Sequence, residues 1–305
     1  MSARPGQTAE RTSGRSAPWL QSNWDLRAAG NFVFGGAGTG LVLFAAVGHA
    51  FGAGYVLPVL IGLALVAAGL LCVWAEIGRP LRALNVYRHA KTSWMTREAM
   101  VAPFLFASAL GAAWTGSQIL VWTAAALAAA YLACQAQMIK AARGIPAWRS
   151  AHIVPLVMLT GLCEGAGLAI LIAAASADHG RFRWLEACLV ALVLARALAW
   201  YAYRSGLQRA GAPRGALAAL SRIEIPFAML GNWMPIALLF IALASPSANV
   251  VFWLGTICAL ATILSGWMFK VVLITRAALN QGFALPRTAV RGTGRGGPAA
   301  RPGWR

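Results

Sequence analysis

Long stretches without a charged residue alternate with short basic segments along this chain. No Asp, Glu, Lys or Arg occurs in residues 28–75, 99–139 or 225–269. Each stretch is about twice the roughly 20 apolar residues with which an α-helix crosses a bilayer. Each is therefore predicted to form a helical hairpin, with turns at the small and turn-forming residues of 51–54, 115–117 and 245–249.

A fourth pair of apolar segments, residues 153–175 and 185–203, is interrupted by Glu164 and Arg196. The pattern thus predicts an all-α integral membrane protein, a bundle of about eight transmembrane helices, within residues 23–280. Residues 1–22 are polar and 281–305 are rich in Gly, Pro and Arg, so we expect both terminal segments to be disordered.

The basic residues lie almost entirely on one side of this predicted topology. Arg181 and Arg183 are the basic residues of the loops on the opposite side, and Arg196 falls inside a span. The others, with Lys270 assigned to the C-terminal tail, lie in the N-terminal segment, the alternate loops and the tail. By the positive-inside rule, we expect both termini and the loop of residues 76–98 in the cytoplasm.

The formal net charge of +18 does not require a nucleic acid partner. Basic cytoplasmic loops commonly set topology and contact anionic lipid head groups. Docking of an acidic soluble subunit is the other interpretation, and the two are compatible.

Cysteine and histidine positions argue against a bound redox centre. The five cysteines are single and scattered over different predicted spans, with no C-x-x-C pair. The four histidines fall in loops or at the ends of spans, so they do not offer axial ligands at matching depth. We expect this chain to bind no haem, iron–sulfur cluster or metal.

Glycines in the first span resemble a phosphate-binding loop but have a simpler explanation. Gly35, Gly36, Gly38 and Gly40 lie inside an apolar span and no strand precedes them. Small residues four apart let two membrane helices approach closely. We therefore predict close helix packing through Gly36 and Gly40.

Two carboxylates bracket the basic loop of residues 76–98. Glu76 ends the second predicted span and Glu98 begins the third, so the two should lie at similar depth. Carboxylates at a membrane boundary are costly and often mark proton transfer, which makes both residues candidate proton carriers. The plainer alternative is an interfacial charge paired with a nearby arginine of the loop.

Glu164 and Arg196 form a second candidate pair, deeper in the membrane. Glu164 lies 11 residues into its span, which at about 1.5 Å per residue is roughly 16 Å deep. An Arg196 side chain could bridge to it from the next span. The pair is either a buried ion pair that fixes helix packing or part of a proton path.

The loop sequence also carries a family resemblance. The segments E-I-G-R-P-L-R-A-L-N (76–85) and T-S-W-M-T-R-E (92–98) resemble the membrane anchor subunits of molybdopterin iron–sulfur oxidoreductases, such as the dimethyl sulfoxide reductase anchor and polysulfide reductase membrane subunits. The opening N-W-D-L-R-A-A-G-N-F (23–32) is most similar to the membrane subunit of phenylacetyl-CoA:acceptor oxidoreductase. Pro146 and Trp148 match the same family.

The resemblance implies a function and a set of residues. Glu98 falls on the acid implicated in quinol binding, and Glu76 falls where some members have a histidine and others an acid. Arg82 and Asn85 match the loop motif; Trp94 would wall a quinone ring, and Asn31 or His152 would hydrogen-bond a quinone oxygen.

The implied protein passes electrons between a partner iron–sulfur subunit and membrane quinone, either ubiquinone or menaquinone. The expected partners are a four-cluster iron–sulfur subunit and a molybdopterin catalytic subunit on the cytoplasmic face of a bacterial inner membrane. A proton-coupled transporter is the alternative function, and a purely structural anchor is a third.

Overall fold

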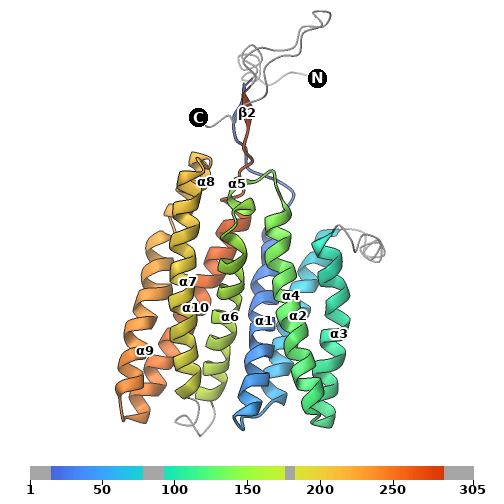
Figure 1. Cartoon of the computed structure of the whole chain (residues 1–305), viewed down its shortest axis with the longest axis vertical. Coiled ribbons are helices and arrows are strands. Elements are labelled where there is room, and N and C mark those ends of the chain that lie inside the picture. Colours follow the sequence, from blue (N-terminus) through green and yellow to red (C-terminus); the bar gives the residue numbers. More distant parts are fainter. Residues whose placement is uncertain (1–14, 78–92, 176–182, 285–305) are drawn as a thin grey trace, which may run out of the picture.

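Eight long apolar helices make up most of the protein. The computed structural model describes residues 15–77, 93–175 and 183–284 (Figure 1). Within these residues, eight helices are long and apolar enough to cross a membrane, which confirms the predicted all-α bundle of eight spans. The chain is a multi-pass membrane protein.

The spans follow one another in alternating directions. They are α1 (Leu26–Ala50), α2 (Val56–Ile77), α3 (Trp94–Thr115), α4 (Gln118–Ala141), α6 (Ile153–Ala174), α7 (Arg183–Arg209), the pair η3 (Pro226–Trp233) and α9 (Met234–Ala244), and α10 (Ala248–Thr275). Two short helices, α5 (Pro146–Arg149) and α8 (Arg214–Ser221), lie in the connections. We call the end of the bundle that carries the paired strands β1 (Arg15–Ser16) and β2 (Phe283–Ala284) in Figure 1 the terminal end.

Helix α1 holds the two sides of the bundle together. It contacts α2 and α4 on one side and α6 and α10 on the other, and Figure 1 shows it between these groups. Most of its residues are buried, whereas α2 and α3 leave many apolar side chains exposed. Exposed apolar side chains on the outer helices suit contact with lipid.

Glycines allow α1 to touch α6 backbone to backbone. A Cβ atom on Gly40 would overlap the Gly161 carbonyl oxygen, and one on Gly165 would overlap the carbonyl carbon of Gly40. A Cβ atom on Gly161 would lie 3.1 Å from the Gly36 carbonyl oxygen. The predicted packing through Gly36 and Gly40 is confirmed, and it brings polar side chains of neighbouring helices close to α1.

The seventh span changes from a π-helix to an α-helix at Met234, next to Pro235. Proline has no backbone N–H, so Gly231, four residues earlier, lacks the donor it would have in an α-helix. Its carbonyl oxygen accepts a hydrogen bond from the Arg196 guanidinium instead. Asn232 donates from Nδ2 to the Phe227 carbonyl, 2.7 Å away, five residues back. The irregular segment therefore supplies oxygen atoms to a buried arginine.

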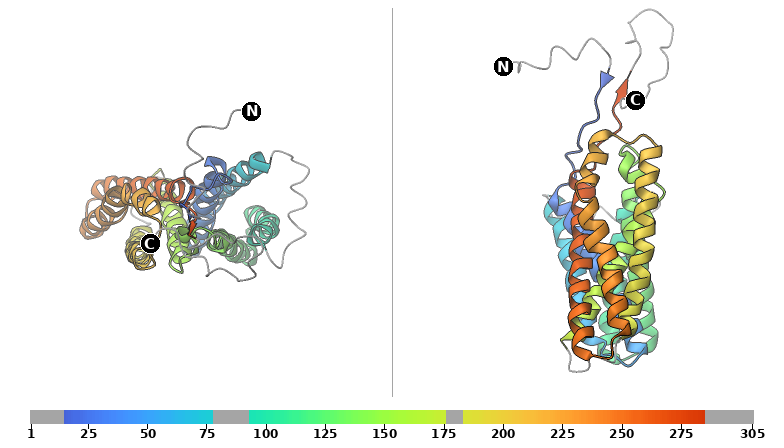
Figure 2. Two further views of the ribbon diagram at one scale, coloured as in Figure 1. Left: turned by 90° about the horizontal axis from the view of Figure 1, so that it is seen from above. Right: turned by 90° about the vertical axis from the view of Figure 1, so that its left-hand side faces the viewer.

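The described parts of the N-terminal and C-terminal segments pair with each other through backbone hydrogen bonds. Strand β1 (Arg15–Ser16) pairs antiparallel with β2 (Phe283–Ala284), as Figure 2 shows above the bundle, and a further bridge joins Leu20 to Leu279. In residues 15–22 and 281–284 the structure thus differs from the disorder expected for 1–22 and 281–305. That expectation came from amino-acid composition, which does not reveal backbone hydrogen bonds between distant segments. The remaining residues of both termini lie outside the described ranges.

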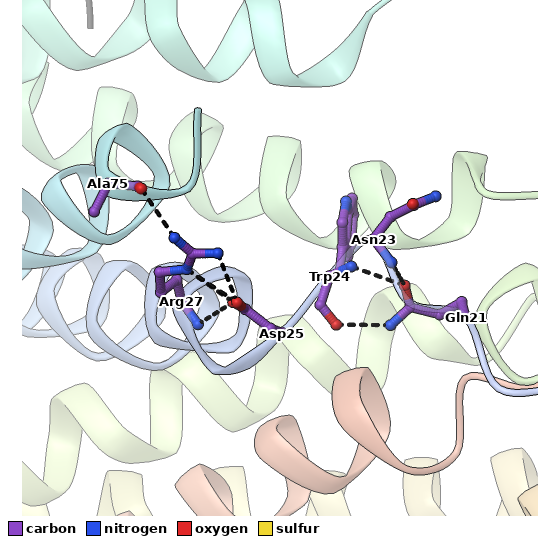
Figure 3. A network of polar contacts seen from close by, with 6 residues as sticks. All are labelled: Gln21, Asn23, Trp24, Asp25, Arg27 and Ala75. Atoms are coloured by element: carbon purple, nitrogen blue, oxygen red, sulfur yellow. Dashed lines mark hydrogen bonds and ion pairs between the residues drawn. The ribbon is translucent and has the colours of Figure 1, made fainter. Parts of the chain in front are cut away.

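Side-chain hydrogen bonds fix the chain where it enters α1 (Figure 3). Gln21 accepts from the backbone N–H groups of Asn23 and Trp24 and donates to the Trp24 carbonyl, 2.7 Å away. Asp25 caps the helix by accepting from the Arg27 N–H at 2.7 Å. Arg27 also donates to the Ala75 carbonyl at 3.0 Å, which ties the start of α1 to the end of α2.

Candidate functional site

Glu98 is buried near the terminal end of the bundle. Ser93 caps α3 by accepting from the Thr96 N–H at 3.3 Å. Glu98 follows four residues into the helix, about 6 Å along its axis. Only 3% of its surface is exposed. A carboxylate in such surroundings is stable only where hydrogen bonds or a cation compensate its charge.

Neutral amides from two other helices bind the Glu98 carboxyl group. Asn31 of α1 donates from Nδ2 to Glu98 Oε1 at 3.2 Å, and Gln135 of α4 donates from Nε2 to the same oxygen at 3.1 Å. Gln135 Nε2 also donates to the Asn31 backbone carbonyl at 3.0 Å, which fixes its orientation. Three helices therefore converge on one carboxyl oxygen.

The same site contains polar atoms that have no hydrogen-bond partner in the described part of the chain. They are Asn31 Oδ1 and Gln135 Oε1. The Tyr131 hydroxyl, one turn before Gln135 on α4, faces the Glu98 carboxyl group and interacts with it. Buried polar atoms normally find partners. The two free amide oxygens therefore give the site spare capacity to accept hydrogen bonds from a ligand.

An apolar groove lies between α2 and α3 on the outside of the bundle. Its volume is about 470 Å³, and it is lined by Ala67, Leu70, Leu71, Trp74 and Phe106. Leu71 and Trp74 are largely exposed. Leu70 and Phe106 pack against the buried cluster that includes the Tyr131 ring. The groove is open to the lipid-facing surface, and two of its residues reach the buried cluster of which Tyr131 is a member.

The structure does not bring Glu76 into this site. Glu76 lies in the last turn of α2, where it interacts electrostatically with Asp25 and Arg27. The hydrogen bond from Arg27 lowers the pKa of Asp25 below its usual value. Within the described residues no hydrogen bond or ion pair joins Glu76 to Glu98. Similar depth along the bundle therefore does not place the two carboxylates together.

The structure places the other predicted site residues as follows. Asn31 is a direct partner of Glu98, as described. Trp94 begins α3 and lies under the Arg97 guanidinium, 4.2 Å from the ring centre. His152 precedes α6 and packs near Gly206 of α7, away from the residues that bind Glu98. Arg82 and Asn85 lie outside the described residues.

Gln135 and Tyr131 are not among the site residues predicted from the sequence. The signal available was their helical spacing of four residues within a span that has no charged residue. An amide in such a span is uncommon enough to mark a polar interior site. What the spacing does not reveal is that this face of α4 meets Glu98.

A second buried polar group lies deeper, and it corrects the predicted pairing of Glu164 with Arg196. Glu164 pairs with Lys270 of α10, with Nζ and Oε2 2.6 Å apart, and the two side chains are 0% and 1% exposed. Lys270, assigned from the sequence to the tail, lies inside the last span. Helix α10 continues beyond the apolar stretch because a buried carboxylate compensates the lysine charge.

Arg196 binds neutral oxygen atoms instead of Glu164. Its Nε donates to Asn232 Oδ1 at 2.9 Å and its Nη1 to the Thr262 carbonyl at 3.3 Å, in addition to the Gly231 carbonyl. The guanidinium also lies 5.1 Å from the centre of the Phe227 ring. The Gly231 carbonyl, the Asn232 side chain and a carbonyl of α10 thus solvate this buried cation.

The two buried polar groups meet across a glycine of α1. A Cβ atom on Gly36 would contact Lys270 Nζ on one side and would lie 3.7 Å from Gln135 Oε1 on the other. The absence of a side chain at Gly36 therefore leaves Gln135, which binds Glu98, close to Lys270, which binds Glu164.

Comparison with known proteins gives no further guide to this site. No family model matches the chain, and no curated protein matches it either. The function is therefore inferred from the residues of the site.

Proposed function

We propose that this chain is the quinone-reactive membrane subunit of an oxidoreductase complex, with Glu98 at the quinone site. The observation that carries the proposal is a buried carboxyl group bound by two neutral amides whose own oxygens are unpartnered. A lipid-facing apolar groove on α2 and α3 adds to it. The sequence resemblance of residues 76–98 to the anchor subunits of molybdopterin iron–sulfur oxidoreductases supports the same function.

The residues of the site suit the chemistry of a quinol. Oxidation of a quinol releases two electrons and two protons, and a carboxylate within hydrogen-bonding distance of the hydroxyl group can accept a proton. The oxygens of Asn31 and Gln135 are free to accept a hydrogen bond from a quinol hydroxyl group. The apolar groove on α2 and α3 would hold part of the isoprenoid tail away from water.

The electrons need an acceptor or donor outside this chain. The resemblance supplies an iron–sulfur subunit and a molybdopterin subunit, with phenylacetyl-CoA:acceptor oxidoreductase or a dimethyl sulfoxide reductase-like enzyme as the complex. The terminal end of the bundle exposes several basic side chains, namely Lys140, Arg143, Arg149, Arg209, Arg214 and Arg222. They favour docking of an acidic protein surface there, and a cytoplasmic orientation in a bacterial inner membrane.

The test is a quinol-dependent electron-transfer assay on the tagged complex purified in mild detergent. In Glu98→Gln the rate should fall at least tenfold, because the amide cannot accept the quinol proton. Assembly, followed by the iron and molybdenum content of the eluate, should not change. Glu186→Gln removes another buried carboxyl group, at the opposite end of the bundle, and should leave the rate unaltered.

Two results would contradict the proposal. Full activity of Glu98→Gln would remove Glu98 from the reaction, and a preparation with neither iron nor molybdenum would argue against an anchor subunit altogether. The second candidate, a proton-coupled transporter, is favoured by the broken seventh span beside Arg196. Substrate-dependent proton uptake by vesicles that contain this chain alone would support that candidate.

A further inference from the structure

The buried polar contacts continue from Glu98 into the middle of the bundle. Gln135 donates from Nε2 to Glu98, and its Oε1 has no partner in the described residues. Lys270 Nζ lies across Gly36 from that oxygen and donates to Glu164 Oε2 at 2.6 Å. Lysine carries three N–H donors on a flexible chain, so Lys270 can bind Glu164, Gln135 or both.

The two carboxyl groups lie at different distances from one cation. Glu164 contacts Lys270 directly, whereas Glu98 binds Gln135, whose free Oε1 lies near Lys270 Nζ beside Gly36. Glu164 also keeps an unpartnered oxygen, Oε1, next to Gly266. One ammonium group cannot fully compensate two buried carboxylates, so ionising both at once is costly.

We propose that Lys270 is a positioning residue that couples the protonation of Glu98 to that of Glu164, so that the two carboxyl groups share one proton. When Glu98 is protonated, Lys270 pairs with an ionised Glu164. When Glu98 is ionised, Lys270 turns toward Gln135 Oε1 and Glu164 holds the proton. The net exchange moves one proton between the two carboxyl groups and leaves Lys270 charged in both states.

Other ionisable groups lie close to both carboxyl groups. Tyr131 and Cys134 of α4 interact with Glu98. Arg196 of α7 and Cys163 of α6 interact electrostatically with Glu164 and Lys270. Arg196 is already bound to three neutral oxygen atoms from η3 and α10. It adds a fixed positive potential but is not free to replace Lys270 as the shared cation.

The coupling would link the quinone site at Glu98 to Glu164, which lies deeper in the membrane. This link to quinone chemistry rests on the proposed function. Glu164 lies 11 residues into α6, roughly 16 Å from the start of the helix. Beyond it, Gly167 packs on the Ala259 carbonyl and the Ile263 side chain, which closes the next turn of the interface. Protonation of Glu98 would therefore favour the ionised, Lys270-paired form of Glu164 in the middle of the bundle.

The coupling can be measured on the isolated full chain, without a partner subunit or a quinone. Infrared spectroscopy follows the C=O band of each protonated carboxyl group as pH changes, and Glu164→Gln identifies the Glu164 band. In Glu98→Gln, which is neutral at all pH values, the Glu164 band should disappear at a pH at least about half a unit lower, because a nearby negative charge has been removed. Lys270→Arg keeps the cation and should retain the shift produced by Glu98→Gln.

Gln135→Leu provides the decisive comparison. It removes the amide that lies between Lys270 and Glu98. The Glu164 band should therefore disappear at the same pH in Gln135→Leu and in the double variant Gln135→Leu with Glu98→Gln. A shift of equal size with and without Gln135 would overturn the proposed connection, and so would no shift in Glu98→Gln. Loss of quinol activity bears on the proposed function alone, since the infrared result does not depend on it.

Discussion

Replacing Lys270 with methionine is expected to destabilise the folded bundle by about 3–5 kcal/mol, because Glu164 would remain buried without its cation. The pair is fully enclosed, with Nζ and Oε2 2.6 Å apart. Methionine is similar in length and apolar, so the loss reports the uncompensated carboxylate more than a cavity. The measurement is unfolding of the purified chain in a denaturing detergent, followed by circular dichroism.

Two further variants separate the ion pair from other effects of the substitution. Lys140→Met removes an exposed lysine near the end of α4 and should change stability by less than about 0.5 kcal/mol. The double variant Lys270→Met with Glu164→Gln removes both charges and should be more stable than Lys270→Met alone. If the double variant were as unstable as the single one, the pair would not be the cause.

Gly165→Ala is expected to cost at least about 3 kcal/mol, near the upper end of the range for overpacked interiors. The added Cβ would overlap the Gly40 carbonyl carbon, and neither backbone can move aside as a side chain would. Helices α1 and α6 would have to separate. Because α1 also carries Asn31 and Gly36, the separation should disturb the Glu98 site as well.

The matched control for this substitution is Gly111→Ala in α3. There the new Cβ would meet only Leu120 Cδ1, at 3.1 Å, and the end of a side chain can shift. Alanine also favours a helix over glycine, so the control should be neutral or slightly stabilising. Equal stability of the two alanine variants, measured by thermal unfolding in detergent, would contradict the proposed backbone contact.

The helices were predictable because their signal is local. Apolar stretches of membrane length and the turn residues between them identify each span without knowledge of its neighbours. Glu98 was a candidate for the same reason, since a carboxylate at the edge of an apolar segment is a local signal, whereas Asn31 came from the family resemblance. Lys270 was misplaced because the same local rule assigns a charge at the edge of an apolar stretch to the adjoining loop.

The pairing of polar side chains could not be predicted from the same pattern. Glu164 and Arg196 lie at compatible depths, yet Lys270, 106 residues away in sequence, is the partner of Glu164. The sequence gives the depth of a polar side chain along its helix. Its partner also depends on how each helix is rotated about its axis and on which helices are neighbours. Gln135 shows the same limit, because its role follows from facing Gly35 and Gly36 of α1.

The sequence by itself determined that this protein is a bundle of eight membrane-spanning helices with buried carboxylates, because hydrophobicity and helix length act within each segment. Only the tertiary structure decided that α1 lies at the centre, that Glu98 binds Asn31 and Gln135, and that Lys270 belongs to Glu164. The physical reason is that bare glycine backbone lets helices approach closely, and close approach selects which polar groups can satisfy one another.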